Sequence, residues 1–164
     1  MLLLRFTLLT VVLATAHCTC RTDEHPLMSM DYCVKIYDVQ LTDYAGAQSA
    51  CRKGNGNLVS IHSAFDNRII QLLYAGAYGG EQFALLGMRM DDRTKKLQWE
   101  DGTALNYENW ENGRPSHLDL EEIVVMNIKT GQWRVTDFGL TTKYIYACEY
   151  PDPSSSTILK KLLA

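Results

Sequence analysis

The sequence predicts an α+β domain with its helices in the amino-terminal half and its strands mainly in the carboxy-terminal half. Helical periodicity is confined to the residues before Gly80, whereas alternating or continuous apolar runs dominate after it. Residues 102–120 follow neither pattern, and an aperiodic stretch of this length inside a compact domain predicts a functional loop.

Residues 1–16 have the pattern of a secretion signal. Arg5 precedes an apolar run, and the segment ends on a small-x-small pattern at residues 14–16. The run is shorter than the ~20 residues that a membrane-spanning helix needs. We therefore expect the signal to be removed and the protein to be secreted and extracellular, with residues 17–31 as a flexible leader.

Composition argues against nucleic acid and membrane insertion as partners. The chain has 16 basic and 19 acidic residues, and loss of Arg5 with the signal leaves a net charge of −4. Nucleic acids and anionic membranes favour a basic stripe, and none is visible in the sequence. The remaining length fits one domain, expected at residues 32–150 and followed by a disordered tail at 151–164.

The first half begins with a strand and a helix. Alternation predicts the strand at Cys33–Gln40, and Thr42 is the expected N-cap of a helix that runs through Cys51 and ends at the glycines beyond it. A short strand follows at Asn57–His62.

A second helix of about ten to twelve residues is expected between Ser63 and Tyr74, because Ser63 and Asp66 resemble a capping box. Its apolar stripe, expected to face the core, is formed by Phe65, Ile69, Leu72 and Leu73.

The second half is predicted to consist of strands around the aperiodic loop. The last three strands follow that loop, and a turn at residues 129–131 joins the first two of them. The expected strands are Phe83–Met90, Leu97–Gly102, Glu122–Ile128, Gln132–Phe138 and Tyr144–Tyr150.

All the cysteines lie after the proposed cleavage site, which suits an oxidising compartment where disulfides persist. There are five: Cys18, Cys20, Cys33, Cys51 and Cys148. Because five is odd, one thiol stays unpaired or binds another chain.

Six short motifs follow one another between Cys33 and Tyr150: CVKIY, LLGM, LQWEDG, YENW, GRPS and GQW. In this order and spacing they resemble the C-type lectin-like domain family. The resemblance implies that Cys51 and Cys148 form the disulfide that closes the domain. It also implies that Cys33 pairs with Cys20 or, as the alternative, with Cys18. A disulfide-linked dimer through Cys18 or Cys20 is therefore a candidate assembly.

One departure from the family pattern concerns the long loop. The family's second disulfide falls at positions that here hold Ile123 and Phe138, so apolar burial would replace a covalent tie and the loop is expected to be more mobile. The tryptophans are expected to pack in the core or loop rather than to stack on sugars; they are Trp99, Trp110 and Trp133.

The resemblance also implies a calcium and sugar site on the long loop, at five ligand positions. These are occupied by Arg114, Ser116, Glu121, Arg134 and Val135. Calcium takes six to eight oxygen ligands, and of these residues only Glu121 keeps an acidic ligand. We expect no calcium or other cofactor, with Glu121 as the residual metal candidate. Arg114 and Arg134 are expected to pair with Glu121 and Asp137 instead.

Function is therefore expected to be non-enzymatic recognition of a glycan or protein ligand, without calcium. No histidine stands with a serine or cysteine in a spacing typical of nucleophilic catalysis. Two alternatives remain: a calcium-dependent carbohydrate-binding lectin, and a structural or inhibitory extracellular subunit assembled through the spare cysteine. The expected binding surface is the long-loop face, represented by Arg114, Ser116, Glu121, Arg134 and Asp137.

Overall fold

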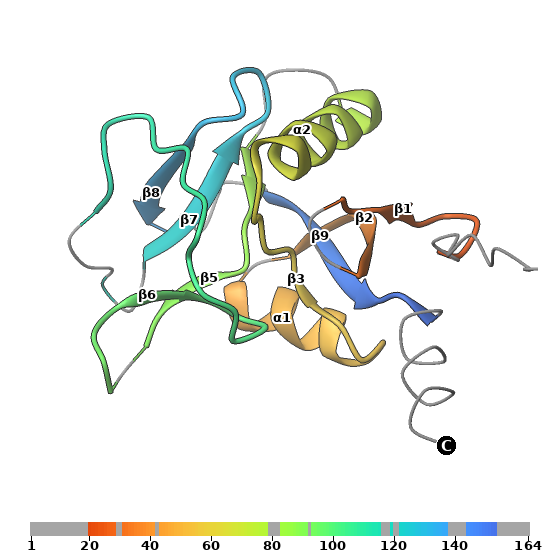
Figure 1. Cartoon of the computed structure of the whole chain (residues 1–164), viewed down its shortest axis with the longest axis horizontal. Helices are drawn as coiled ribbons and strands as arrows, with labels where there is room; N and C mark the ends of the chain where they lie inside the picture. Colours follow the sequence, from red (N-terminus) through yellow and green to blue (C-terminus); the bar gives the residue numbers. More distant parts are fainter. Residues whose placement is uncertain are drawn as a thin grey trace, which may run out of the picture.

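The computed structural model describes residues 20–28, 31–41, 43–78, 83–91, 93–115, 119, 122–137 and 144–153. Within these residues the chain forms two helices and nine strands, which confirms the predicted α+β class (Figure 1). No helix in this part of the chain is long and apolar enough to cross a membrane. The expected signal at 1–16 and the tail beyond residue 153 lie outside the described residues.

The centre of the fold is a seven-stranded sheet in the described chain, with strand order β1-β2-β9-β4-β7-β8 and β3 beside β9. Its strands are β1 (His25–Pro26), β2 (Tyr32–Leu41), β3 (Asn57–Leu58), β4 (Phe83–Leu85), β7 (Glu122–Asn127), β8 (Trp133–Asp137) and β9 (Tyr144–Pro151). The β4–β9 pair is parallel and the others are antiparallel. A separate hairpin is formed by β5 (Met88–Met90) and β6 (Leu97–Trp99).

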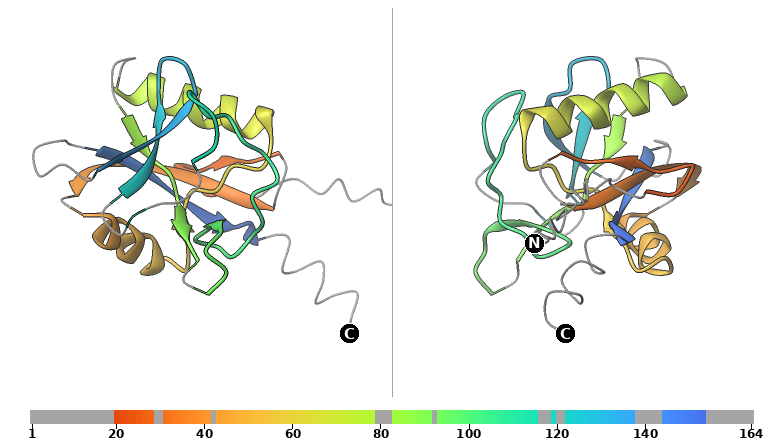
Figure 2. Two further views of the ribbon diagram at one scale, coloured as in Figure 1. Left: turned by 90° about the vertical axis from the view of Figure 1, so that its left-hand side faces the viewer. Right: turned by 45° about the vertical axis from the view of Figure 1, so that its right-hand side comes forward.

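The two helices cover opposite faces of this sheet (Figures 1 and 2). Side chains alternate along a strand, so Ile145 and Ala147 of β9 join the core cluster under α2 (Ala64–Tyr78), whereas Tyr146 and Cys148 join the cluster under α1 (Tyr44–Arg52). Burial on both faces explains why β7 and β9 are continuous apolar runs in the sequence.

Helix α1 begins one residue later than expected. Asp43 is its N-cap, with its carboxylate accepting a hydrogen bond from the Gly46 amide, while Thr42 lies outside the described residues. The helix ends at Arg52, and the amides of Gly54 and Gly56 donate to the Cys51 carbonyl, so the glycines do close the helix.

The predicted stripe of α2 is only partly right: Ile69 packs against the core, but two of its other members do not. The helix runs for 15 residues, and Phe65 and Leu72 are 73% and 52% exposed. Ile70 and Tyr74 are buried instead, together with three polar side chains: Asp66, Asn67 and Gln71. Apolar periodicity misplaced the buried face because part of that face is polar and satisfied by hydrogen bonds, described below.

The predicted strand Phe83–Met90 is split into β4 and β5 at Gly87. Its amide donates to the Val59 carbonyl at 2.9 Å, and a Cβ at this position would lie 2.3 Å from the Leu58 carbonyl oxygen. Glycine permits this close approach of two backbones, which redirects the chain from the sheet to the hairpin. The predicted strand Asn57–His62 is likewise shortened to β3.

The described part of the leader is ordered rather than loose. Residues 25–26 form β1 against β2, and Leu27 is 6% exposed. A disulfide joins Cys20 to Cys33, whose Cα atoms are 5.6 Å apart. Covalent and ladder bonds together attach this segment to the sheet edge, an arrangement that composition could not reveal.

Candidate functional site

The long loop, residues 102–120, is irregular in its described part but docks against β8. Trp110 forms an isolated bridge to Trp133. The Trp133 amide donates to the Asn109 carbonyl at 2.8 Å, and the Glu111 amide donates to the Trp133 carbonyl at 2.9 Å. These backbone hydrogen bonds hold the loop alongside β8, the edge strand next to β7 (Figure 1).

Trp133 is the aromatic centre beneath this loop. Its ring makes edge contacts with Trp99, Tyr107 and Trp110, each at a centroid distance of 5.6 Å. Trp99 and Trp133 are fully buried and Trp110 is half-buried. The expected packing role of the tryptophans is thus what the structure has, and the two buried rings are closed to a sugar.

Three side-chain amides hold the loop and the β7–β8 turn together. Asn67 of α2 and Asn109 of the loop both donate to the Gly131 carbonyl, at 3.1 and 2.8 Å. Gln71 donates to the Ile128 carbonyl at 2.9 Å. Asn67 also accepts the Trp133 indole N–H at 2.8 Å. These bonds satisfy the polar face that α2 buries.

A buried polar cluster anchors the root of the loop to β9. Glu149 is fully buried and accepts hydrogen bonds from the Ser60 amide at 2.8 Å and the Ser60 hydroxyl at 2.6 Å. Asp101 accepts the amide and hydroxyl of Thr103 at 2.8 and 2.5 Å. Burial raises the pKa of Glu149 to about 8 although the Ser60 bonds oppose this, and the nearby Asp101 adds to the rise.

His62 belongs to the same cluster. Its Nε2 lies 3.1 Å from the Ser60 hydroxyl and 3.0 Å from the Thr103 hydroxyl, and its Nδ1 lies 2.8 Å from Asn106 Oδ1. Ser60 is 0% exposed, so its hydroxyl is closed to a substrate. Sequence reasoning missed this cluster because its members are spread from residue 60 to residue 149.

Arg114 is neutralised within the loop by a residue that sequence reasoning did not select. Its guanidinium lies 3.0 Å from Glu108 Oε1, and the other oxygen of Glu108 accepts the Trp110 indole N–H at 2.6 Å. The expected partner Glu121 lies outside the described residues. Glu108 is six residues from Arg114 on the same irregular loop, which brings the two side chains into reach.

Arg134 does not pair with Asp137, contrary to expectation. Its guanidinium carbon lies 3.8 Å from the centroid of the Phe83 ring, a cation–π contact. Arg134 and Asp137 are three positions apart in β8, and an odd separation places their side chains on opposite faces of the strand. In the described residues neither side chain makes an ion pair.

The remaining predicted site residues are only partly visible. Ile123, at one position of the family's second disulfide, is 3% exposed and packs in the α1-side core cluster. Its counterpart Phe138 lies outside the described residues, as do Ser116 and Glu121.

The residues at the implied calcium site do not fit that ion. Arg114 presents an ion-paired guanidinium and Arg134 a second cation, and neither offers a lone pair. Val135 is apolar. Among the described residues no group of three or more His, Cys, Asp or Glu side chains is placed to hold a metal.

Comparison with known proteins agrees with this architecture. The family described as Lectin C-type domain matches residues 40–150. The structure of the C-type lectin CEL-I from Cucumaria echinata superposes with a TM-score of 0.67 and 20% identity, covering 80% of this chain and 96% of that one. The type II antifreeze protein of herring superposes with a TM-score of 0.64 and 25% identity, covering 80% and 98%.

The chain belongs to the C-type lectin family. A C-type lectin of Cerberus rynchops is 25% identical over 121 residues, which are 72% of this chain and 76% of that protein. The galactose-specific lectin nattectin of Thalassophryne nattereri is 30% identical over 92 residues, 56% of this chain and 58% of that protein. Both expected disulfides are present, Cys51–Cys148 and Cys20–Cys33.

Proposed function

We propose that this protein is a secreted, non-enzymatic recognition protein that binds a glycan or protein ligand through its long-loop face without calcium. The observation that carries the proposal is the Arg114–Glu108 contact of 3.0 Å. A cation bound to an internal carboxylate stands where a calcium ligand is expected. The lectin family, and the galactose-specific name of one relative, support a glycan as the first ligand class to test.

Arg134 is the side chain of this face best suited to an anionic group. It is exposed, and its guanidinium rests on the Phe83 ring without a carboxylate partner in the described chain. A planar guanidinium held on an aromatic face keeps its N–H donors available for a carboxylate. An acidic glycan, such as a sialylated one, therefore suits this site better than a neutral sugar.

The direct experiment is a thermal melt with calcium and with chelator, together with a glycan array probed under both conditions. We expect the same melting temperature and the same array pattern in the two conditions. A higher melting temperature with calcium, accompanied by sugar binding that disappears in chelator, would contradict the proposal in favour of an ordinary calcium-dependent lectin.

A gain-of-function variant tests the same point from the opposite side. Four substitutions restore oxygen ligands at the implied positions: Arg114→Glu, Ser116→Asn, Arg134→Asn and Val135→Asp. If the site lacks only ligands, calcium should raise the melting temperature of this variant and leave the wild type unchanged. If calcium changes the melting temperatures of the variant and the wild type equally, the missing oxygen ligands do not explain how the wild type responds to calcium.

A disulfide-linked dimer is a second proposal, favoured by the cysteine pairing. Four of the five cysteines are bonded, so Cys20 is not available and Cys18 is left as the candidate. Non-reducing electrophoresis of the secreted protein should show a band of doubled mass that disappears with reductant and in Cys18→Ser. A purely monomeric band removes this proposal.

A further inference from the structure

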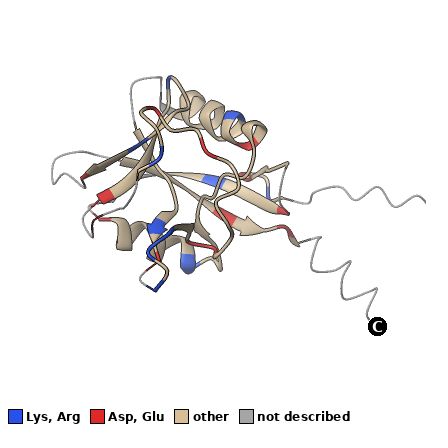
Figure 3. Cartoon of the chain, turned by 60° about the vertical axis from the view of Figure 1, so that its left-hand side comes forward, with Lys and Arg blue, Asp and Glu red and all other residues tan. Residues whose placement is uncertain are grey.

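A cationic surface lies away from the long-loop face, on the β5–β6 hairpin and the adjoining end of α1. Segments 52–53 and 88–100 carry six cationic residues and, in their described part, two carboxylates, Asp91 and Glu100. Figure 3 shows several of the blue segments gathered there, in the lower part of the view. This basic hairpin face comprises Arg52, Lys53, Arg89, Arg93, Lys95 and Lys96.

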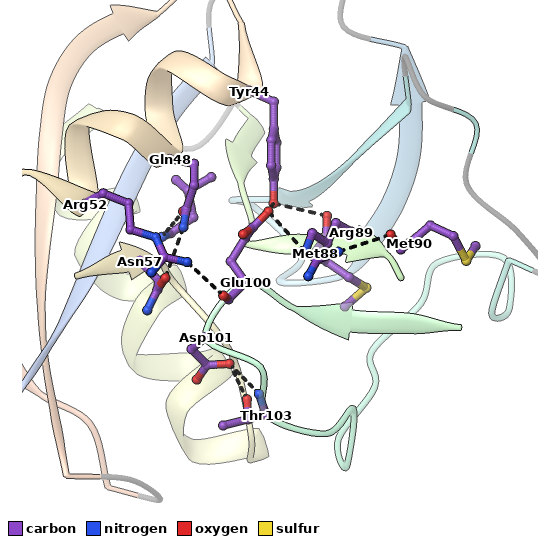
Figure 4. A network of polar contacts seen from close by, with 11 residues as sticks. Tyr44, Gln48, Arg52, Asn57, Met88, Arg89, Met90, Glu100, Asp101 and Thr103 are labelled. Atoms are coloured by element: carbon purple, nitrogen blue, oxygen red, sulfur yellow. Dashed lines mark hydrogen bonds and ion pairs between the residues drawn. The ribbon is translucent and has the colours of Figure 1, made fainter. Parts of the chain in front are cut away.

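The cations meet because Glu100 joins the hairpin to α1 (Figure 4). Its carboxylate accepts the Tyr44 hydroxyl at 3.1 Å and lies 3.7 Å from Nε of Arg89, while its backbone carbonyl accepts a bond from Arg52 at 3.4 Å. Residues more than forty positions apart in the sequence thus form one surface. No basic stripe is visible in the sequence for this reason.

Strand alternation turns the cations of the hairpin outward. Met88 and Leu97 face the core, and Trp99 beside them is fully buried. Side chains one position away point to the other face, which places Arg89 and Lys96 together on the solvent side.

Asp91 contacts the described residues of the hairpin tip. Its carboxylate accepts the amides of Arg93 and Thr94 at 3.2 and 2.6 Å and the Thr94 hydroxyl at 2.7 Å. These bonds hold the pKa of Asp91 below its usual value. The Lys95 amide donates to the Asp91 carbonyl at 2.8 Å, so Asp91 contacts the backbone of each of the next three described residues, two of which are cations.

Most of these charges are not consumed internally. Four of the six are exposed and form no ion pair within the described chain: Lys53, Arg93, Lys95 and Lys96. Asp92, which is next to Arg93 in the sequence, lies outside the described residues. Arg52 donates to a neutral carbonyl and has no ion-pair partner among the described residues. Within the described residues, Arg89 is the one cation of this face with a carboxylate at ion-pair distance.

We propose that the basic hairpin face is a second binding site, specific for a sulfated polysaccharide and independent of the long-loop face. A cluster of exposed cations suits a polymer that carries many sulfates. Each single exposed ion pair contributes little, and the contributions of several pairs add. The long-loop arginines are not part of this surface.

Two other polyanions fit the surface less well. Insertion into an anionic membrane needs apolar side chains beside the cations, but the exposed large hydrophobic residues of the described chain lie elsewhere: Met28, Phe65 and Leu72. Binding of single-stranded nucleic acid favours aromatic rings for base stacking, and the solvent side of the hairpin presents Arg89, Lys96 and Gln98 instead.

The test is the affinity of the secreted protein for heparin, measured by calorimetry at low and physiological salt. We expect binding that weakens with salt, and a loss of about tenfold in Lys95→Gln/Lys96→Gln. Single variants give a matched comparison: Lys95→Gln should lose about threefold, whereas Lys129→Gln, an exposed cation on the β7–β8 turn, should bind like the wild type.

Four outcomes would overturn the inference. One is a wild type that binds desulfated heparin as well as heparin, or that binds neither. Another is an equal loss in Lys95→Gln and Lys129→Gln, which would indicate net charge alone. The third is binding lost in Arg134→Gln and kept in Lys95→Gln/Lys96→Gln, which would move heparin to the long-loop face.

That third outcome leaves the proposed function standing. Calcium-dependent sugar binding, in contrast, would contradict the proposed function and leave the basic hairpin face unaffected. Phosphatidylserine vesicles captured in place of heparin would likewise reject a polysaccharide site.

Discussion

Glu108 joins Arg114 and Trp110 within the long loop: Oε1 lies 3.0 Å from the Arg114 guanidinium, and Oε2 accepts the Trp110 indole N–H at 2.6 Å. One carboxylate thus links two other residues of the same loop. The two partners of the ion pair remain 49% and 31% exposed, so this closure orders the loop more than it stabilises the domain.

Glu108→Gln should open the loop while leaving global stability within about 1 kcal/mol, because exposed ion pairs contribute little. The expected signature is faster amide hydrogen exchange in residues 103–115 with an almost unchanged melting temperature. Glu111→Gln, which changes a neighbouring exposed carboxylate, is the control. Equal exchange in the two variants would show that Glu108 does not hold the loop.

Stability should decrease as the pH rises toward about 8, owing to Glu149. The pKa of this carboxyl is raised from 4.5 to about 8, so the folded chain keeps a proton that the unfolded chain has already released. This contribution is complete below the unfolded pKa and is lost as the pH rises through the folded pKa. Denaturant unfolding across this range should show a decline for the wild type relative to Glu149→Gln, which cannot titrate. Parallel curves would contradict the assignment.

The Cys51–Cys148 bridge should contribute more stability than Cys20–Cys33. The two bridges close separations of 97 and 13 residues. In the chain-entropy model these correspond to roughly 4.7 and 3 kcal/mol. Denaturant unfolding of the double Cys→Ala variants, each compared with the wild type, measures the difference. A larger loss from the shorter bridge would mean that native packing, rather than loop length, decides.

Asn67→Ala should destabilise the domain by about 1–3 kcal/mol, because the indole N–H of Trp133 would remain buried without an acceptor. Leu72→Ala on the exposed side of α2 should cost less than about 0.5 kcal/mol. Thermal unfolding of both variants checks which face of the helix is buried. If Leu72→Ala lost more stability than Asn67→Ala, the apolar face predicted from the sequence would be the buried one.

The fold was largely predictable from the sequence, and the site was not. Helical and alternating periods located α1, α2 and most strands, and motif order indicated the family, because these signals are local. The face of α2 was misplaced, since Asn67 and Gln71 are buried through partners near residue 130. Likewise, the break at Gly87 depends on the approach of Leu58, which no local pattern contains.

The sequence by itself determined the class of fold, the Cys51–Cys148 pairing implied by the family motifs, and the loss of oxygen ligands at Arg114, Arg134 and Val135. Only the tertiary structure decided that Cys20 bonds Cys33, that Glu108 neutralises Arg114, and that cations of α1 and the hairpin form one surface. The physical reason is range: propensity and periodicity act over a few residues, whereas a partner for a charge or a buried amide is set by whichever distant segment the packed core brings within about 3 Å.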